Sequence, residues 1–134
     1  MKSLLAVACA ALALTAPAAR ADDARNLVAT PVVKNALRAA FAHAHPRYTT
    51  AQVKGPVAGR TYYGRYSGVE YALAVFSIPL FGTQDQPELF RRKAGGAWQD
   101  RGDTGGDVCP GWVPLPLLKA WRLPAAGSGC YYVP

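Results

Sequence analysis

Residues 60–78 read RTYYGRYSGVEYALAVFSI, and this stretch decides the fold. Strand-forming residues alternate on either side of Ser67-Gly68, a pair that is typical of a tight turn. We therefore predict a hairpin with strands over 60–66 and 69–78. Both faces of the second strand are largely apolar, which indicates a central strand whose outer half is also covered.

A helix is predicted before this hairpin. Thr30 is suited to cap its start and Pro31 to occupy its first turn. Apolar residues then recur at intervals of four, at Val33, Leu37 and Phe41. Pro46 ends the pattern, because proline cannot continue a helix. The spacing predicts an amphipathic helix with a narrow apolar stripe that packs on a sheet.

A second hairpin and a C-terminal segment follow. Turn residues and alternation predict strands over 89–92 and 97–100, a glycine-rich loop over 102–107, a short helix over 115–121 and a last strand over 130–133. The whole pattern predicts an α+β fold. One N-terminal amphipathic helix would pack on an antiparallel meander of about four strands, with the C-terminal segment tied by one disulfide.

The first 21 residues have the features of a secretory signal peptide. Lys2 precedes an apolar run, and Ala19-Arg20-Ala21 is a small-x-small cleavage site, with a cut after Ala18 as the alternative. We expect residues 22–29 to form a flexible arm and 30–134 a single domain. The product would be secreted, into the extracellular or cell-envelope space. It would not be an integral membrane protein, because polar residues or prolines interrupt every later apolar run.

Two cysteines remain after the leader, which contains Cys9. An oxidising compartment favours disulfides in small secreted domains, so we predict a structural bridge between Cys109 and Cys130. Their spacing is not C-x-x-C, and with His43 and His45 they match no standard zinc pattern. The two histidines are interpreted as exposed or helix-capping residues, and we predict neither a cofactor nor a metal site.

The chain is basic, with a formal net charge of +7. Without Lys2 and Arg20 of the leader, 13 basic and 8 acidic residues leave a charge of +5. Such a surface attracts anionic polymers, although solubility alone also explains it. We expect an anionic cell-envelope polymer or an extracellular protein as partner. Nucleic acid is not expected, because no recognised nucleic-acid-binding pattern is present.

Residues 102–106 read GDTGG, which resembles two protease motifs. Thr104 occupies the position where a trypsin-like site needs its serine nucleophile. The aspartic-protease tripeptide should follow a hydrophobic strand, whereas Arg101 and Gly102 come before Asp103 here. We interpret the segment as turns in which aspartates cap and glycines adopt positive φ, and predict no catalytic residues. A calcium site is the alternative, from Asp100, Asp103 and Asp107.

Aromatic and basic residues alternate in the first hairpin. Such rings and guanidinium groups bind sugars, peptides or nucleobases by stacking and cation–π contacts. Tyrosine is also a favoured strand residue, and alternate positions must point into the core. The candidate ligand-binding residues are Arg60, Tyr62, Tyr63, Arg65 and Tyr66.

Four segments carry a resemblance that spans roughly residues 30–122. They are YYGRY (62–66), VEYALA (69–74), T-x-DQPE (83–88) and W-x-D-x-GDTGG (98–106). In these segments the chain resembles small secreted proteins of high-GC Gram-positive bacteria. That group has no assigned activity, so the resemblance implies secretion and a shared fold, and it implies no catalytic residues.

These observations predict a secreted, non-enzymatic domain that binds an envelope or extracellular polymer. A small hydrolase is one alternative, with Glu70 and Asp85, Asp100 or Asp103 as paired carboxyl groups about 5 to 9.5 Å apart. A protease inhibitor is another, because a helix followed by an antiparallel meander resembles cystatin-like folds. Residues 52–56 (QVKGP) do not match the Q-x-V-x-G pattern of those inhibitors.

Overall fold

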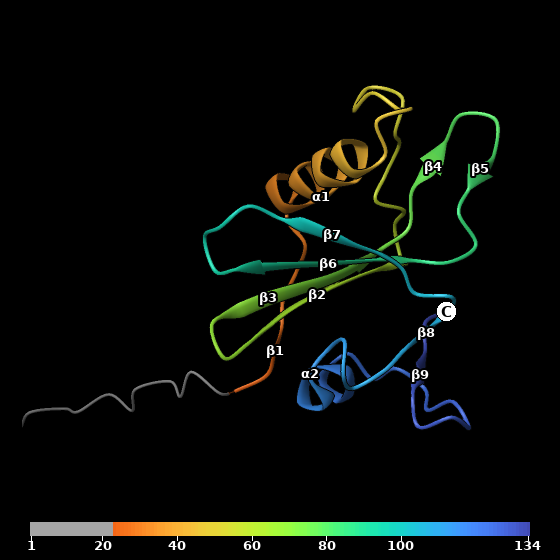
Figure 1. Ribbon diagram of the computed structural model, residues 1–134. Helices are drawn as coiled ribbons and strands as arrows, with labels where there is room; N and C mark the ends of the chain where they lie inside the picture. The colour runs from red at the N-terminus through yellow and green to blue at the C-terminus, as the bar shows by residue number, and fades with distance from the viewer. Residues whose placement is uncertain (1–22) are drawn as a thin grey trace, which may run out of the picture.

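A computed structural model describes residues 23–134 and shows an antiparallel sheet with a different layer on each face (Figure 1). In order across the five-stranded sheet, the strands are β1 (Arg25–Asn26), β2 (Thr61–Tyr66), β3 (Val69–Ala74), β6 (Glu88–Lys93) and β7 (Gln99–Asp103). The α+β fold class is therefore confirmed. The signal peptide expected over residues 1–21 lies outside the described residues and stays a prediction.

Helix α1 (Pro31–Ala44) covers one face of this sheet. Its start is capped as expected, since the Thr30 hydroxyl accepts the N–H of Val33 at 3.3 Å. Leu37 and Phe41 are buried, and the Phe41 ring stacks on Phe76 with centroids 4.7 Å apart. The apolar stripe that defined the helix in the sequence thus forms the first core.

A short helix, α2 (Leu115–Ala120), and the C-terminal segment cover the opposite face. Leu117 and Leu118 are fully buried there with Leu73 of β3. Ala72 and Ala74, which alternate with Leu73, belong to the core under α1. The central strand is therefore covered on both faces, as its apolar alternation predicts.

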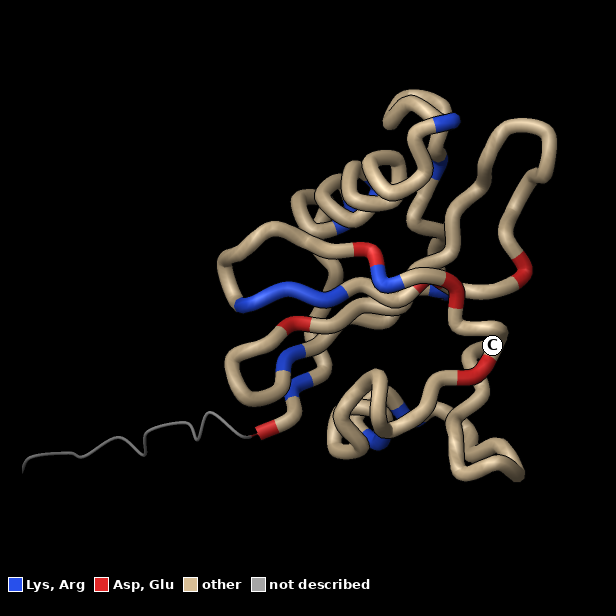
Figure 2. Tube along the Cα trace, viewed as in Figure 1, with Lys and Arg blue, Asp and Glu red and all other residues tan. Residues whose placement is uncertain are grey.

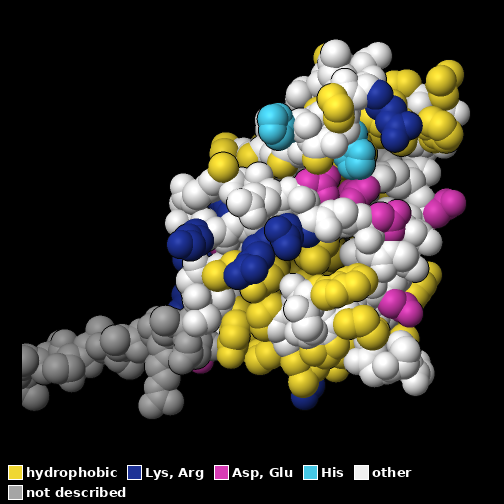
Figure 3. Space-filling model, viewed as in Figure 1, with side chains coloured by type: hydrophobic (Ala, Val, Ile, Leu, Met, Phe, Trp, Pro, Cys, Tyr) yellow, Lys and Arg dark blue, Asp and Glu magenta, His cyan; other side chains and the backbone are white. Residues whose placement is uncertain are grey.

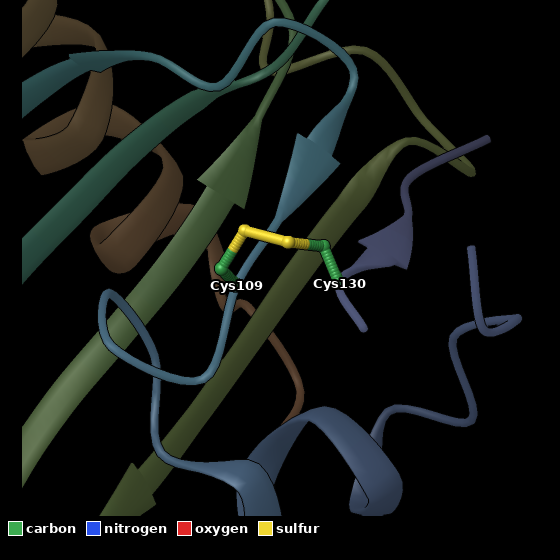
Figure 4. Close-up of a disulfide and its surroundings, with 2 residues drawn as sticks. All are labelled: Cys109 and Cys130. Atoms are coloured by element: carbon green, nitrogen blue, oxygen red, sulfur yellow. A yellow bond between two sulfur atoms is a disulfide. The ribbon is translucent and has the colours of Figure 1, made fainter. Parts of the chain in front are cut away.

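The predicted disulfide joins Cys109 to Cys130 (Figure 4). It lies beside a two-stranded ladder of β8 (Asp107–Val108) and β9 (Tyr131–Tyr132). The bridge and this ladder hold together a segment rich in glycine and proline, which would otherwise have few backbone partners.

The first hairpin forms with the predicted turn, since Tyr66 pairs with Val69 across Ser67-Gly68. The second strand ends earlier than expected, at Ala74. Beyond it, backbone groups of residues 75–77 pair with the loop over 54–57. The chain then forms a separate small ladder of β4 (Ser77–Ile78) and β5 (Gly82–Thr83).

The segment predicted as an arm, residues 22–29, also contains ordered structure. Strand β1 pairs with β2, with Arg25 opposite Arg65. Because β1 precedes α1, the helix is the second element of the described chain. Over residues 23–134, no helix combines the length and the hydropathy that a membrane crossing requires.

Candidate functional site

The five residues predicted to bind a ligand do not share one surface. Tyr63 is 7 % exposed and belongs to the core under α1. Tyr62, the adjacent position, points to the other face and packs against Trp121, with ring centroids 6.0 Å apart. Arg60 donates hydrogen bonds to the carbonyl oxygens of Gln84 and Asp85. Strand alternation therefore distributes the hairpin's rings between two cores.

Arg65 and Tyr66 complete the predicted set. The Arg65 guanidinium donates to Glu70 Oε1 and is therefore already paired, although its side chain is exposed. Tyr66 is partly exposed at the end of β2. Among the five residues, Tyr62 and Tyr66 thus keep partly accessible rings on the same side of the sheet, and ligand binding by them stays a prediction.

Glu70 is held by arginines and not by the loop aspartates. Its side chain is buried, and its two carboxylate oxygens accept hydrogen bonds from Arg65 and Arg92. Burial raises the pKa of Glu70, but the hydrogen bonds from the two arginines outweigh it, so the pKa lies below its ordinary value. Glu70 is therefore an ionised structural group.

The glycine-rich loop predicted over 102–107 is shorter in the structure, because β7 runs to Asp103 and β8 begins at Asp107. Asp100 Oδ1 accepts the N–H of Gly102 at 2.8 Å, and Asp103 Oδ1 accepts that of Gly105 at 2.5 Å. Gly102 and Gly105 both have positive φ, 98° and 69°. The aspartates accept local N–H groups and the glycines adopt positive φ as predicted, but Gly102 and Asp103 belong to β7, so only the second half of GDTGG forms a turn.

A different set of titratable residues converges where α1 meets β6 and β7. His45 Nε2 lies 3.5 Å from Asp100 Oδ2 and 3.8 Å from Glu88 Oε1. Burial and the neighbouring Asp100 raise the pKa of Glu88 to about 7, and burial also raises that of Asp100. No pattern in the sequence indicates this cluster, and the alternative calcium site predicted from Asp100, Asp103 and Asp107 includes only one of its members.

The fold explains why these three residues meet. His45 is the C-cap of α1, as one interpretation of the histidines expected, and its ring packs on Phe41 with centroids 4.2 Å apart. The ladder of β6 and β7 shifts register between Glu88 and Phe90, and Asp100 pairs with Phe90. A bulge of this kind re-aims side chains, so Glu88 and Asp100 point to the same place.

A depression of about 290 Å³ lies on the α2 side of the sheet. Residues from β6, β7 and the loop before α2 line it: Leu89, Arg91, Arg101, Gly102, Asp103, Thr104, Gly111 and Trp112. Trp112 is 52 % exposed, and within the described part of the chain neither Arg91 nor Arg101 forms an ion pair. Figure 3 shows basic side chains next to a broad hydrophobic area on this face.

A second depression, of about 340 Å³, adjoins the first through Arg91. Arg91, Arg92 and Lys93 are consecutive in β6 and line it with Gly96, Ala97 and Gln99. Figure 2 shows this basic run at one end of β6. The two depressions therefore form one basic surface with a single exposed indole at its α2 end.

Comparison of the chain with protein-family models, with curated proteins and with solved structures finds no match.

Proposed function

We propose that the protein is a secreted, non-enzymatic domain that binds an anionic polysaccharide at the depression between Arg91, Arg101 and Trp112. One observation carries the proposal. A half-exposed indole stands beside two guanidinium groups that have no carboxylate partner among the described residues. An aromatic ring with free cations is the combination that an acidic sugar requires.

Each group has a defined task in this proposal. The Trp112 face would stack on a sugar ring, because indoles combine a large apolar surface with low conformational cost. Arg91 and Arg101 would each donate two parallel hydrogen bonds to carboxylate, sulfate or phosphate oxygens. Asp103 lies at the same depression, and one carboxylate against two guanidinium groups leaves the site positive.

The binding groups stand on rigid parts of the fold. Arg91 projects from β6, and its guanidinium lies 5.8 Å from the Tyr71 ring centroid. Arg101 belongs to β7. The N–H of Trp112 donates to the carbonyl oxygen of Cys109, so the disulfide fixes the loop that carries the indole. Sites built on rigid elements lose little entropy when a ligand binds.

A polymer fits this surface better than a single small ligand. The adjoining depression continues the basic surface along β6 away from Trp112 through Lys93, whereas Arg92 is paired with Glu70. A chain of acidic sugars that stacks on Trp112 would place its next anionic group over Lys93. Both depressions are open to solvent, because small residues form parts of their walls: Gly111 in the first, and Gly96 and Ala97 in the second.

The paired carboxyl groups of the structure support binding over glycoside hydrolysis. Glycosidases hold their two carboxyl groups about 5 Å or more apart, with a sugar between them. In this chain the carboxyl groups that come together are those of Glu88 and Asp100, and their side chains are only 4 % and 3 % exposed, which leaves no room for a sugar between them. They also line neither of the two depressions.

Binding to polygalacturonate, a polymer of acidic sugars, tests the proposal, with dextran as the neutral polymer. We expect retention on immobilised polygalacturonate and none on dextran. The double variant Arg91→Gln/Arg101→Gln and the single variant Trp112→Ala should each weaken binding at least about tenfold, which corresponds to 1.4 kcal/mol.

A matched control separates a site from simple charge attraction. The double variant Arg47→Gln/Arg122→Gln removes the same charge from exposed positions outside both depressions. It should bind polygalacturonate like the unmodified protein. Equal losses in the two double variants, or full binding by Trp112→Ala, would contradict a defined site. Release of reducing sugars from the polymer would instead establish an enzyme.

A further inference from the structure

The cluster of His45, Glu88 and Asp100 has the features of a site for a cation. The donor atoms come from the end of α1, the start of β6 and the middle of β7. One atom from each residue lies within 4.8 Å of the other two. Figure 3 shows histidine and acidic side chains meeting at the surface below α1, so an ion from solvent could reach them.

The cluster is short of positive charge. The Glu88 and Asp100 side chains are 4 % and 3 % exposed, and over residues 23–134 neither forms an ion pair with a lysine or arginine. Apart from one another, Glu88 Oε2, Asp100 Oδ2 and His45 Nε2 have no hydrogen-bond partner in this part of the chain. Two buried carboxyl groups that face each other are costly to ionise, and a bound cation removes that cost.

Other contacts orient each of the three groups. Gln84 Nε2 donates to Glu88 Oε1 at 3.2 Å, while Gln84 Oε1 accepts the N–H of Phe76. Asp100 Oδ1 accepts the N–H of Gly102, which leaves Oδ2 free to face the cluster. The His45 ring is held against Phe41. Metal ligands are typically fixed in this way by an outer set of contacts.

The distances fit a small divalent ion. Bonds of about 2.0 to 2.2 Å to a tetrahedral ion separate two donor atoms by about 3.3 to 3.6 Å. The 3.5 Å and 3.8 Å separations around His45 Nε2 are close to this range. One imidazole nitrogen with two carboxylates favours a transition metal, because Mg²⁺ and Ca²⁺ prefer oxygen ligands alone.

We propose that His45, Glu88 and Asp100 bind one divalent transition-metal ion of the Zn²⁺ type, with solvent completing its coordination on the exposed side of His45. The ion would join the end of α1 to β6 and β7, and would thereby fasten the helix to the sheet. This proposal does not depend on polysaccharide binding, because the cluster and the two depressions share no residue.

Titration of the purified protein with Zn²⁺, after treatment with EDTA and with free thiols blocked, tests the proposal. We expect one Zn²⁺ per chain and a rise in Tm with metal. Glu88→Gln and Asp100→Asn should each weaken Zn²⁺ binding by more than about tenfold. Co²⁺ in place of Zn²⁺ should give the visible absorption of a four-coordinate site, and these variants should lose it.

Control variants and the metal-free state make the outcome decisive. His43→Gln and Asp85→Asn alter exposed residues outside the cluster and should bind Zn²⁺ normally. In EDTA, Glu88→Gln and Asp100→Asn should be at least as stable as the unmodified protein, because each removes one of two buried carboxyl groups that face each other without a cation. Absence of a bound Zn²⁺, equal weakening by His43→Gln, or stability losses in EDTA that match the losses in binding would overturn the proposal.

Discussion

Glu70 and Arg92 lie directly opposite each other on β3 and β6, and Arg92 Nε donates to Glu70 Oε2 at 2.5 Å. The Arg92 guanidinium also lies 4.4 Å from the Trp98 ring centroid. On the other side, Arg65 of β2 donates to Glu70 Oε1. One buried carboxylate thus connects three neighbouring strands at the polar end of the core under α1.

Replacing Glu70 should destabilise the protein strongly. Glu70→Ala leaves the partly buried Arg92 without its counter-charge, and loss of one partner of a buried pair costs about 3 to 5 kcal/mol. Arg65→Gln should cost clearly less, because the Arg65 side chain is 46 % exposed and water replaces part of the lost contact. Urea unfolding of both variants measures the difference. Equal losses of unfolding free energy in Glu70→Ala and Arg65→Gln would contradict the central role of Glu70 in joining the three strands.

Acid should weaken the same link. The pKa of Glu70 is lowered in the folded protein, where the hydrogen bonds from its arginines outweigh burial. The unfolded chain therefore binds a proton more readily, so this contribution is present above pH 4.5 and is lost as the pH falls through the folded pKa. Unfolding free energies measured from pH 5 downward should decrease, and the decrease should be smaller in Glu70→Gln.

Glu88 should have the opposite effect in protein that is kept in EDTA. Its pKa is raised from 4.5 to about 7, so the folded state holds a proton that the unfolded chain has released. Stability should therefore decline as the pH rises from 4.5 toward 7, by about 3 kcal/mol. Glu88→Gln should remove this decline. A stability profile that is unchanged by the substitution would contradict the assignment of the effect to Glu88.

Gly64 should not tolerate even a methyl group. A Cβ atom at this position would lie 2.5 Å from Leu117 Cδ1 and 2.6 Å from the carbonyl oxygen of Arg25. Gly64→Ala must therefore displace α2 or β1, and overpacking of this kind costs about 1 to 3 kcal/mol. Gly127→Ala is the matched control, because nothing lies within 4 Å of a Cβ there. Thermal unfolding of the two variants should differ clearly.

Loss of the disulfide should affect stability and the proposed site together. The double variant Cys109→Ala/Cys130→Ala opens a loop with a sequence separation of 21 residues, which should cost about 3 kcal/mol. Trp112 lies in this loop, so binding of polygalacturonate should weaken as well. Urea unfolding and retention on the polymer measure the two effects. Unchanged retention would show that the indole does not depend on the bridge.

Local signals were sufficient for most elements of the fold. Thr30 and the apolar spacing after it predicted α1, and Ser67-Gly68 predicted the first turn, because caps and turns depend on residues close together in the chain. The sequence did not predict β1, β5 or β8, and it placed the residues of β4 at the end of one longer strand. Each of these strands has two residues and is defined by its partner, so alternation had too few positions to show it.

The candidate sites were harder to predict. The sequence indicated Tyr63 and Arg65 as ligand-binding residues. In the structure Tyr63 points into the core, and Arg65 points toward Glu70. Trp112 and Arg91 are about twenty positions apart and become neighbours only through the packing of the C-terminal segment on β6. Spacing along the chain could not place them together.

The sequence by itself determined the helix and the two hairpins, because periodicity, caps and turn residues act over short distances. It also predicted the bonded pair of cysteines, because the expected leader contains Cys9 and only Cys109 and Cys130 lie beyond it. The tertiary structure alone decided which charges meet. His45 reaches Glu88 and Asp100 because the end of α1 lies over the register shift in the ladder of β6 and β7. That juxtaposition depends on the packing of three separate segments, and no local pattern encodes it.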